Sequence, residues 1–240
     1  MDRKVILEVC VDSWEGAQIA SQAGADRLEL CEHLACDGIT PSASLLRQVR
    51  SHIEIPLVVL IRQREGDFVY SEPEKDSMVE SAQRAIDAGA AGLAVGASTP
   101  DRHLDWPFLE RMAGVVQRAA THVELVVHRV FDQVPDADKA IPKLAELGFH
   151  RILTSGGARR AIDSLDMLCG WQHEFASMID FLPAGGIDSS NARRILSGSG
   201  CHQLHGSCRK GASGAMRHLP DALEIAALRR ILSEMRSQPS

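Results

Sequence analysis

The residues of this chain that could carry chemistry gather where apolar stretches end. The run L-V-V-L-I at 57–61 is followed at once by Arg62, Arg64 and Asp67, and Gly66 allows the backbone to turn there. Charges at the end of a buried strand are costly unless they meet each other or a ligand. We expect Arg62 and Arg64 to clamp an anionic ligand, with Asp67 shaping the loop behind them. A solvated loop is the alternative.

Two other apolar runs carry a repeated pattern, L-E-V-C and L-E-L-C. Residues two apart in a strand share a face, so Glu8 points with Cys10, and Glu29 points with Cys31. The glutamates could serve as a general base, as metal ligands, or as inert partners of the arginines. The two thiols could bind a soft ion such as Cu(I), or pack as small hydrophobic groups.

Histidines supply the candidates for proton transfer near neutral pH. His128 ends a further apolar run and is followed by Arg129 and Asp132, which together with Glu8 are further candidate ligand-binding residues. If the protein is an enzyme, we expect His128 or Glu29 to carry the proton. A buried core histidine is the alternative for His128. His205 is a second candidate, at the end of a less clearly defined strand.

Three consecutive loops contain glycine next to small polar residues. Glycine exposes backbone N–H groups that can bind phosphate or carboxylate, whereas turn glycines at strand-to-helix corners are the plainer interpretation. The candidate ligand-binding residues in these loops are Thr154, Ser155, Gly156, Gly185, Gly186, His205 and Ser207.

The elements that must position these groups alternate regularly along the chain. We expect strands at 5–10, 26–31, 57–62, 91–95, 123–128, 151–155, 179–184 and 203–207. We expect helices at 13–22, 41–52, 74–88, 106–119, 136–147, within 158–175, at 189–197 and at 221–235. Eight such pairs without a Pro/Ser-rich linker predict one α/β domain over residues 1–240, a single (β/α)8 TIM barrel.

A doubly wound open sheet is the alternative fold. It would call for a glycine-rich fingerprint after the first strand, where the chain has Val11, Asp12 and Ser13. In a barrel, functional groups lie at the C-terminal ends of the strands. We therefore expect one group of side chains to converge at one barrel mouth: Glu8, Glu29, Arg62, His128, Thr154 and His205.

Composition excludes several classes of partner. The net charge of −6 provides no basic field for nucleic acid or an anionic membrane. No apolar run approaches the roughly 18 residues that span a bilayer. The N-terminus enters a strand without a signal-peptide pattern, and the six cysteines form no C-x-x-C pair. These features indicate a cytoplasmic protein with reduced thiols and neither nucleic-acid nor membrane partners.

Taken as a set, the motifs resemble those of the CutC family over roughly residues 4–208. They are A-G-A-D-R-L-E-L-C at 23–31, I-R-Q-R-E-G-D-F-V-Y at 61–70, H-R-V-F-D at 128–132 and L-T-S-G at 153–156. The resemblance implies a cytoplasmic, homodimeric (β/α)8 barrel in copper homeostasis, with Cys10 and Cys31 as Cu(I) ligands. One departure stands out: where the family commonly has G-G-x-T-P, this chain has D-G-I-T-P, preceded by Cys36.

Two functions of different classes follow. The first is a copper-binding protein, which rests on the resemblance and on Cys10 and Cys31. The second is an enzyme acting on a small anionic metabolite, phosphorylated or carboxylated. It would use the arginines as clamps and the glycine loops to hold the anion. So many arginines have no evident use in a copper carrier, so local chemistry favours the enzyme.

Overall fold

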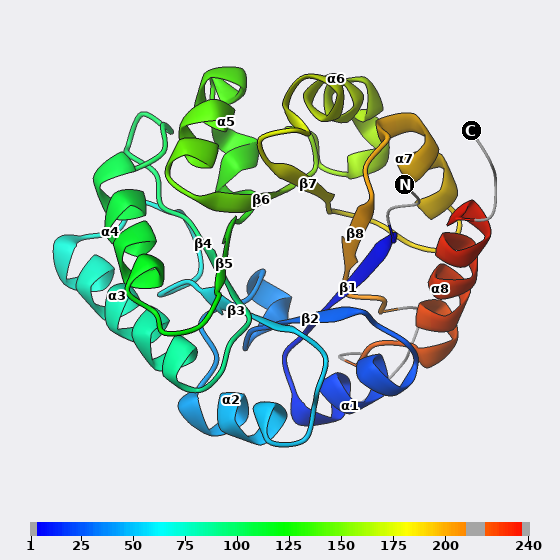
Figure 1. Ribbon diagram of the computed structural model, residues 1–240, viewed down its shortest axis with the longest axis horizontal. Coiled ribbons are helices and arrows are strands. Elements are labelled where there is room, and N and C mark those ends of the chain that lie inside the picture. Colours follow the sequence, from blue (N-terminus) through cyan, green and yellow to red (C-terminus); the bar gives the residue numbers. More distant parts are fainter. Residues whose placement is uncertain (1–3, 210–218, 237–240) are drawn as a thin grey trace.

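Eight parallel strands form the wall of a barrel surrounded by helices in the computed structural model, which describes residues 4–209 and 219–236 (Figure 1). The strands are β1 (Ile6–Val11), β2 (Arg27–Leu30), β3 (Leu57–Ile61), β4 (Gly92–Val95), β5 (Glu124–Val127), β6 (Phe149–Thr154), β7 (Asp180–Pro183) and β8 (Gln203–Gly206). The helices are α1 (Trp14–Gln22), α2 (Ala43–Arg50), α3 (Glu72–Asp87), α4 (Trp106–Gln117), α5 (Ala137–Glu146), α6 (Leu165–Phe175), α7 (Ala192–Ser199) and α8 (Ala222–Arg236). Short 3-10 helices are η1 (Leu34–Cys36), η2 (Arg129–Gln133) and η3 (Ala161–Asp163).

Local signals in the sequence account for these element ends. The Ser13 hydroxyl accepts a hydrogen bond from the Gly16 N–H at 3.1 Å and caps α1. Gly24, Gly89 and Gly148 each follow a helix with φ of +102°, +87° and +89°. Glycine adopts this left-handed conformation without a Cβ clash, so it stops the helix before the next strand.

The strand order confirms the barrel and excludes an open doubly wound sheet. Hydrogen-bonded neighbours run β7-β6-β5-β4-β3-β2-β1-β8, and every pairing is parallel. β7 and β8 lie against each other, but no backbone ladder joins them within the described part of the chain. A side chain bridges this seam instead: Gln203 Nε2 donates to Asp180 Oδ2 at 3.1 Å.

The register between β1 and β2 determines which polar groups become neighbours. Glu8 is paired with Arg27, and Cys10 is paired with Glu29. The two Glu-x-Cys motifs are therefore offset by two residues, as the stagger of a closed barrel requires. On the other side of β1, Glu8 is paired with His205.

The barrel interior is polar at its N-terminal end and apolar above it. Arg27 is ion-paired with Glu8 and donates to Gln203 Oε1 at 2.7 Å, while Arg151 is ion-paired with Glu124. The apolar layer comprises Cys10, Cys31, Val58, Leu60, Ala94, Val126, Leu153, Leu182 and Ala184. Within residues 4–209 and 219–236, no helix combines the length and apolar character that a membrane span needs.

Candidate functional site

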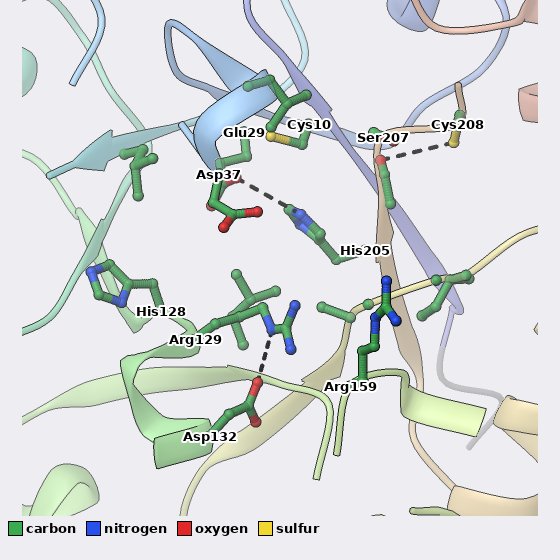
Figure 2. Close-up of a pocket in the computed structure, with 18 of the residues that line it drawn as sticks. Cys10, Glu29, Asp37, His128, Arg129, Asp132, Arg159, His205, Ser207 and Cys208 are labelled. Atoms are coloured by element: carbon green, nitrogen blue, oxygen red, sulfur yellow. Dashed lines mark hydrogen bonds and ion pairs between the residues drawn. The ribbon is translucent and has the colours of Figure 1, made fainter. Parts of the chain in front are cut away.

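A cavity of about 790 Å³ opens at the C-terminal ends of the strands (Figure 2). Four of the six side chains expected to converge there line it: Glu29, Arg62, His128 and His205. Glu8 and Thr154 do not line it. Glu8 is buried beneath His205, with only 2% of its surface exposed. Thr154 is fully buried, and its hydroxyl donates to Asp132.

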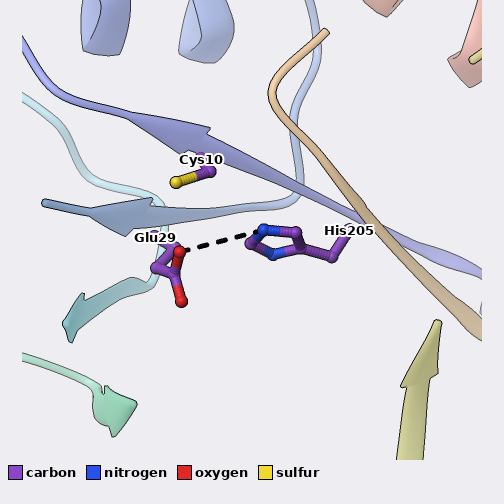
Figure 3. A group of neighbouring side chains, drawn as sticks. All are labelled: Cys10, Glu29 and His205. Atoms are coloured by element: carbon purple, nitrogen blue, oxygen red, sulfur yellow. Dashed lines mark ion pairs between the residues drawn. The ribbon is translucent and has the colours of Figure 1, made fainter. Parts of the chain in front are cut away.

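Cys10, Glu29 and His205 form a compact group at one side of this cavity (Figure 3). One donor atom from each lies within 4.8 Å of the others. His205 Nε2 is 3.8 Å from Glu29 Oε2. The group contains a thiol, a carboxylate and an imidazole, so it combines ligands for soft and harder cations.

Glu8 fixes the orientation of His205 from below. His205 Nδ1 lies 2.8 Å from Glu8 Oε1, which leaves Nε2 to face Glu29. Burial alone would raise the pKa of Glu8, but the Arg27 guanidinium and the hydrogen bond from His205 hold that pKa well below its usual range. Glu8 is therefore a carboxylate, and it accepts a hydrogen bond from the Nδ1–H group of His205.

Cys10, Glu29 and His205 have raised pKa values, in contrast to the lowered pKa of Glu8. Burial raises the pKa of Glu29. The pKa of Cys10 is raised well above its ordinary value by its hydrogen bond to Cys31 and by burial. Burial opposes charge on His205, yet the carboxylates of Glu29 and Glu8 outweigh it and raise the pKa of His205. A bound cation would lower the pKa values of Cys10 and Glu29, because its positive charge favours the thiolate and the carboxylate.

The Cys31 thiol lies behind that of Cys10. The two sulfur atoms are 3.8 Å apart, and both residues are buried. Cys10 lines the cavity, whereas Cys31 is fully buried and its thiol lies 3.6 Å from the Val11 carbonyl oxygen. The pair is thus close enough for both thiols to contact one ion, which would reach them from the cavity side.

His128 lies in the cavity wall as a neutral imidazole. Its Nδ1 accepts a hydrogen bond from the Val130 N–H at 3.1 Å, and its ring packs against Phe68 with centroids 4.9 Å apart. Burial and the nearby Arg62 guanidinium lower the pKa of His128 to about 3. A histidine held in this way is a poor proton carrier near neutral pH, although it can donate from Nε2.

Arg62 lines the cavity, but most of its guanidinium donors bind the chain itself. Nη1 donates to the carbonyl oxygens of Cys36 and Gly38, both at 3.0 Å, and Nη2 donates to Gly66 at 2.9 Å. The guanidinium also lies over the Phe68 ring at 4.9 Å. Arg62 therefore ties the loop after β2 to the loop after β3.

Arg64 and Asp67 belong to the loop surface and do not line the cavity. Arg64 is ion-paired with Asp67 at 3.0 Å and with Glu74 at 2.8 Å. Asp67 also accepts the Val69 N–H at 3.1 Å, which agrees with the loop-shaping role expected from the sequence. A ligand would have to displace these partners to reach the Arg64 guanidinium.

Arg129 and Asp132 begin the wall opposite the cluster. Arg129 donates to Asp132 at 2.8 Å and to the Ser155 hydroxyl at 2.9 Å. Asp132 also accepts the Ser155 N–H at 2.9 Å and the Gly157 N–H at 3.3 Å. Arg129 keeps 40% of its side chain exposed, so it can meet a ligand while Asp132 holds it.

The glycine loops divide into a self-bonded part and an open part. Gly156 donates its N–H to the Thr154 hydroxyl at 2.9 Å. Gly185 and Gly186 line the cavity with φ of +91° and +65°, and their N–H groups have no hydrogen-bond partner among the described residues. Further along this loop, the Glu224 carboxylate of α8 accepts both the N–H and the hydroxyl of Ser189. The chain's own carboxylate therefore binds donors that an anion could otherwise use.

Several residues that line the cavity were not among the site residues predicted from the sequence. Asp37, Phe68, Arg159, Asp188, Cys208, Arg209 and Glu224 all line it. Arg159 lies two residues after the T-S-G-G motif at 154–157, so its place in the sequence could have marked it as a cavity residue. Asp37 adopts φ of +64°, a conformation that aspartate tolerates better than most residues, so the departure at this position preserves the tight turn. Glu224 gave no such signal, because it reaches the cavity from the distant helix α8.

The fold and the site define a (β/α)8-barrel protein with a thiol, carboxylate and imidazole cluster at the C-terminal mouth. Residues 5–210 match the CutC family, and the chain belongs to this family. It is 37% identical over 222 residues to the copper homeostasis protein cutC homolog of Homo sapiens, covering 92% of this chain and 80% of that protein. It is 35% identical over 242 residues to a CutC family protein of Agrobacterium fabrum, covering 95% and 94%.

Solved structures agree on the fold. The crystal structure of the copper homeostasis protein CutC from Streptococcus agalactiae superposes with a TM-score of 0.79 and 29% identity, covering 85% of this chain and 98% of that one. Phosphoribosyl anthranilate isomerase from Thermotoga maritima superposes with a TM-score of 0.62 at 14% identity, covering 96% and 99%. The second likeness concerns the barrel fold alone.

Proposed function

We propose that this protein binds Cu(I) at the barrel mouth through the thiolates of Cys10 and Cys31. The observation that carries the proposal is the separation of 3.8 Å between their two sulfur atoms, both in buried residues, with Cys10 lining the cavity and Cys31 directly behind it. With metal–sulfur bonds of about 2.3 Å, two sulfur atoms on one ion can lie up to about 4.6 Å apart, so this separation lets both thiolates bind a shared ion. Thiolates are the ligands that select Cu(I), and the names of the relatives point to copper homeostasis.

Copper binding can be tested with reduced protein under anaerobic conditions. Wild-type protein should take one equivalent of Cu(I) from a chromophoric Cu(I) chelator. The Cys10→Ser, Cys31→Ser double variant should lose this stoichiometric binding, while Cys36→Ser, which changes a thiol outside the pair, should keep it. Stoichiometric binding that survives in the double variant would show that the ion binds elsewhere.

We also propose that the protein acts in the reducing cytoplasm as a homodimer. All six cysteines are free, including the adjacent Cys10 and Cys31, which suits a reducing compartment. The dimer rests on the family resemblance, and sedimentation equilibrium of the purified chain would test it.

A second candidate function is catalysis on a small anionic metabolite, and the size of the cavity favours it. About 790 Å³ is typical of small-molecule sites and far exceeds what one metal ion occupies. Arg129 and Arg159 could bind the anion beside Gly185 and Gly186, and Glu29 could move the proton. Mass spectrometry of small molecules that co-purify with the native protein would test this candidate, and arginine-to-glutamine changes at 129 and 159 should release them.

A further inference from the structure

The arrangement of Cys10, Glu29 and His205 suits a cation of a different kind from Cu(I). All three donor atoms face one small volume at the cavity edge (Figure 3). Tetrahedral zinc sites place nitrogen and oxygen ligands roughly 3.4 Å apart. The separation of 3.8 Å between His205 Nε2 and Glu29 Oε2 is close to that value. Closing the whole set around one ion requires movements of about an ångström.

The residue behind the histidine supports the same conclusion. The Glu8 carboxylate accepts a hydrogen bond from His205 Nδ1–H, so the ring can bind a cation through Nε2, the atom that faces Glu29, once Nε2 carries no proton. Histidines that bind metal ions usually donate their other ring N–H to a carboxylate or carbonyl in this way. Glu8 is held in turn by Arg27 and is almost fully buried, so this orientation is built into the barrel.

We propose that Cys10, Glu29 and His205 form a three-ligand site for a borderline divalent cation of the zinc type, with the fourth coordination position open to the cavity. Mixed thiolate, imidazole and carboxylate donors suit such a cation, whereas Cu(I) selects soft sulfur ligands. All three ligands line the cavity, so a fourth ligand from solvent or substrate can approach. Three protein ligands and one open position are characteristic of catalytic zinc sites.

This site shares Cys10 with the proposed Cu(I) pair but differs from it in every other ligand. Cys31 has its sulfur on the far side of Cys10 and does not line the cavity. The two ions therefore compete for Cys10, and variants of the unshared residues separate them. A closed ion-pair network of Glu8, His205 and Glu29 without a metal is the competing explanation of the same geometry.

The test uses the metal-free, reduced full-length chain. Zn²⁺ affinity is measured by competition with a chromophoric chelator, and Co²⁺ serves as a spectroscopic probe because a thiolate ligand gives a charge-transfer band. We expect one Zn²⁺ per chain and a thiolate–cobalt band that Cys10→Ser removes. Glu29→Gln and His205→Gln should each weaken Zn²⁺ binding by roughly 100-fold, at or beyond the upper range for residues that only orient a ligand. Both should retain Cu(I) binding at the two thiols.

Two control variants complete the design. Cys31→Ser should lose Cu(I) but retain Zn²⁺ and the cobalt band. Asp37→Asn removes a cavity carboxylate outside the ligand set and should leave Zn²⁺ affinity within a few-fold. Circular dichroism establishes which variants are folded, and the wild-type cobalt band and its loss in Cys10→Ser decide the outcome if Glu29→Gln fails to fold. A folded wild-type protein without the thiolate–cobalt band would overturn the proposal, as would unchanged Zn²⁺ affinity in both Glu29→Gln and His205→Gln.

Discussion

Cys10 lies directly beside Glu29 on the neighbouring strand, and Glu8 lies beside Arg27. If the two Glu-x-Cys motifs were in register, Glu8 would be paired with Glu29, and Cys10 would be paired with Cys31. The two-residue offset gives Glu8 its cation and brings Glu29 next to a thiol. The stagger of the barrel therefore converts two similar motifs into one anchored carboxylate and one mixed donor cluster.

Arg62→Lys should mainly lower stability. Lysine keeps the charge but cannot reach three carbonyl oxygens on two loops as the guanidinium does. With bonds to charged donors worth about 1.5–3 kcal/mol each, we expect a loss of about 2–4 kcal/mol in the free energy of urea unfolding. If Arg62 clamps a ligand instead, ligand affinity will fall in a variant whose unfolding free energy is unchanged.

Acidification should destabilise the protein through His128. Its pKa is about 3 in the folded state against 6.5 for the ordinary group, so the unfolded chain takes up a proton first as the pH falls. The stabilisation is complete above about pH 6.5 and is lost progressively down to about pH 3. The slope is about 1.4 kcal/mol per pH unit. The unfolding free energy measured in urea at several pH values should show this slope. In His128→Gln the slope should fall by about 1.4 kcal/mol per pH unit, the contribution of one proton.

Gly96→Ala should disturb the wall that holds His128. A Cβ at this position would lie 2.5 Å from Val130 Cγ1 and 2.7 Å from His128 Cε1, so at least one side chain must move. We expect thermal and urea unfolding to show a loss of about 1–3 kcal/mol, typical of overpacking. Gly170→Ala is the matched control. It lies in α6 with nothing within 4 Å, and should gain about 0.5–1 kcal/mol.

Glu8→Gln should be strongly destabilising, because it leaves the Arg27 charge buried without its carboxylate partner. Breaking a buried pair from one side typically costs about 3–5 kcal/mol. The double variant Glu8→Gln, Arg27→Met removes both charges and should recover part of that loss. If the Glu8→Gln and wild-type proteins have the same free energy of unfolding in urea, Glu8 does not stabilise the buried Arg27 charge as we infer.

Features set by local sequence could be predicted well. The eight apolar runs, the glycines that end helices, and the polar residues at strand ends depend on neighbours along the chain. Together they predict the barrel and place Glu29, Arg62, His128 and His205 at its mouth, as the structure confirms. Thr154 was misplaced because it adjoins Leu153, which faces the cavity; its own side chain belongs to the Asp132 network.

Features set by distant parts of the chain could not be predicted in this way. Strand register depends on how the whole barrel closes, so the Cys10–Glu29 contact was not evident from two similar motifs. The charge of Arg62 was visible in the sequence, but the carbonyl groups that satisfy it come from two separate loops. Glu224 reaches the cavity from α8, and nothing in its own surroundings in the sequence marks it.

The seam between β7 and β8 has a mechanical consequence. Every other strand junction is held by backbone hydrogen bonds, whereas this one is bridged by side-chain contacts such as Gln203 to Asp180, within the described part of the chain. The barrel is thus a curved sheet whose two edge strands, β7 and β8, are joined by side chains. Because this junction lacks a backbone ladder among the described residues, we expect it to deform more easily than the others. Gly185 and His205 adjoin this junction and line the cavity. If a large ligand widens the cavity, the strands should therefore separate first between β7 and β8, next to His205.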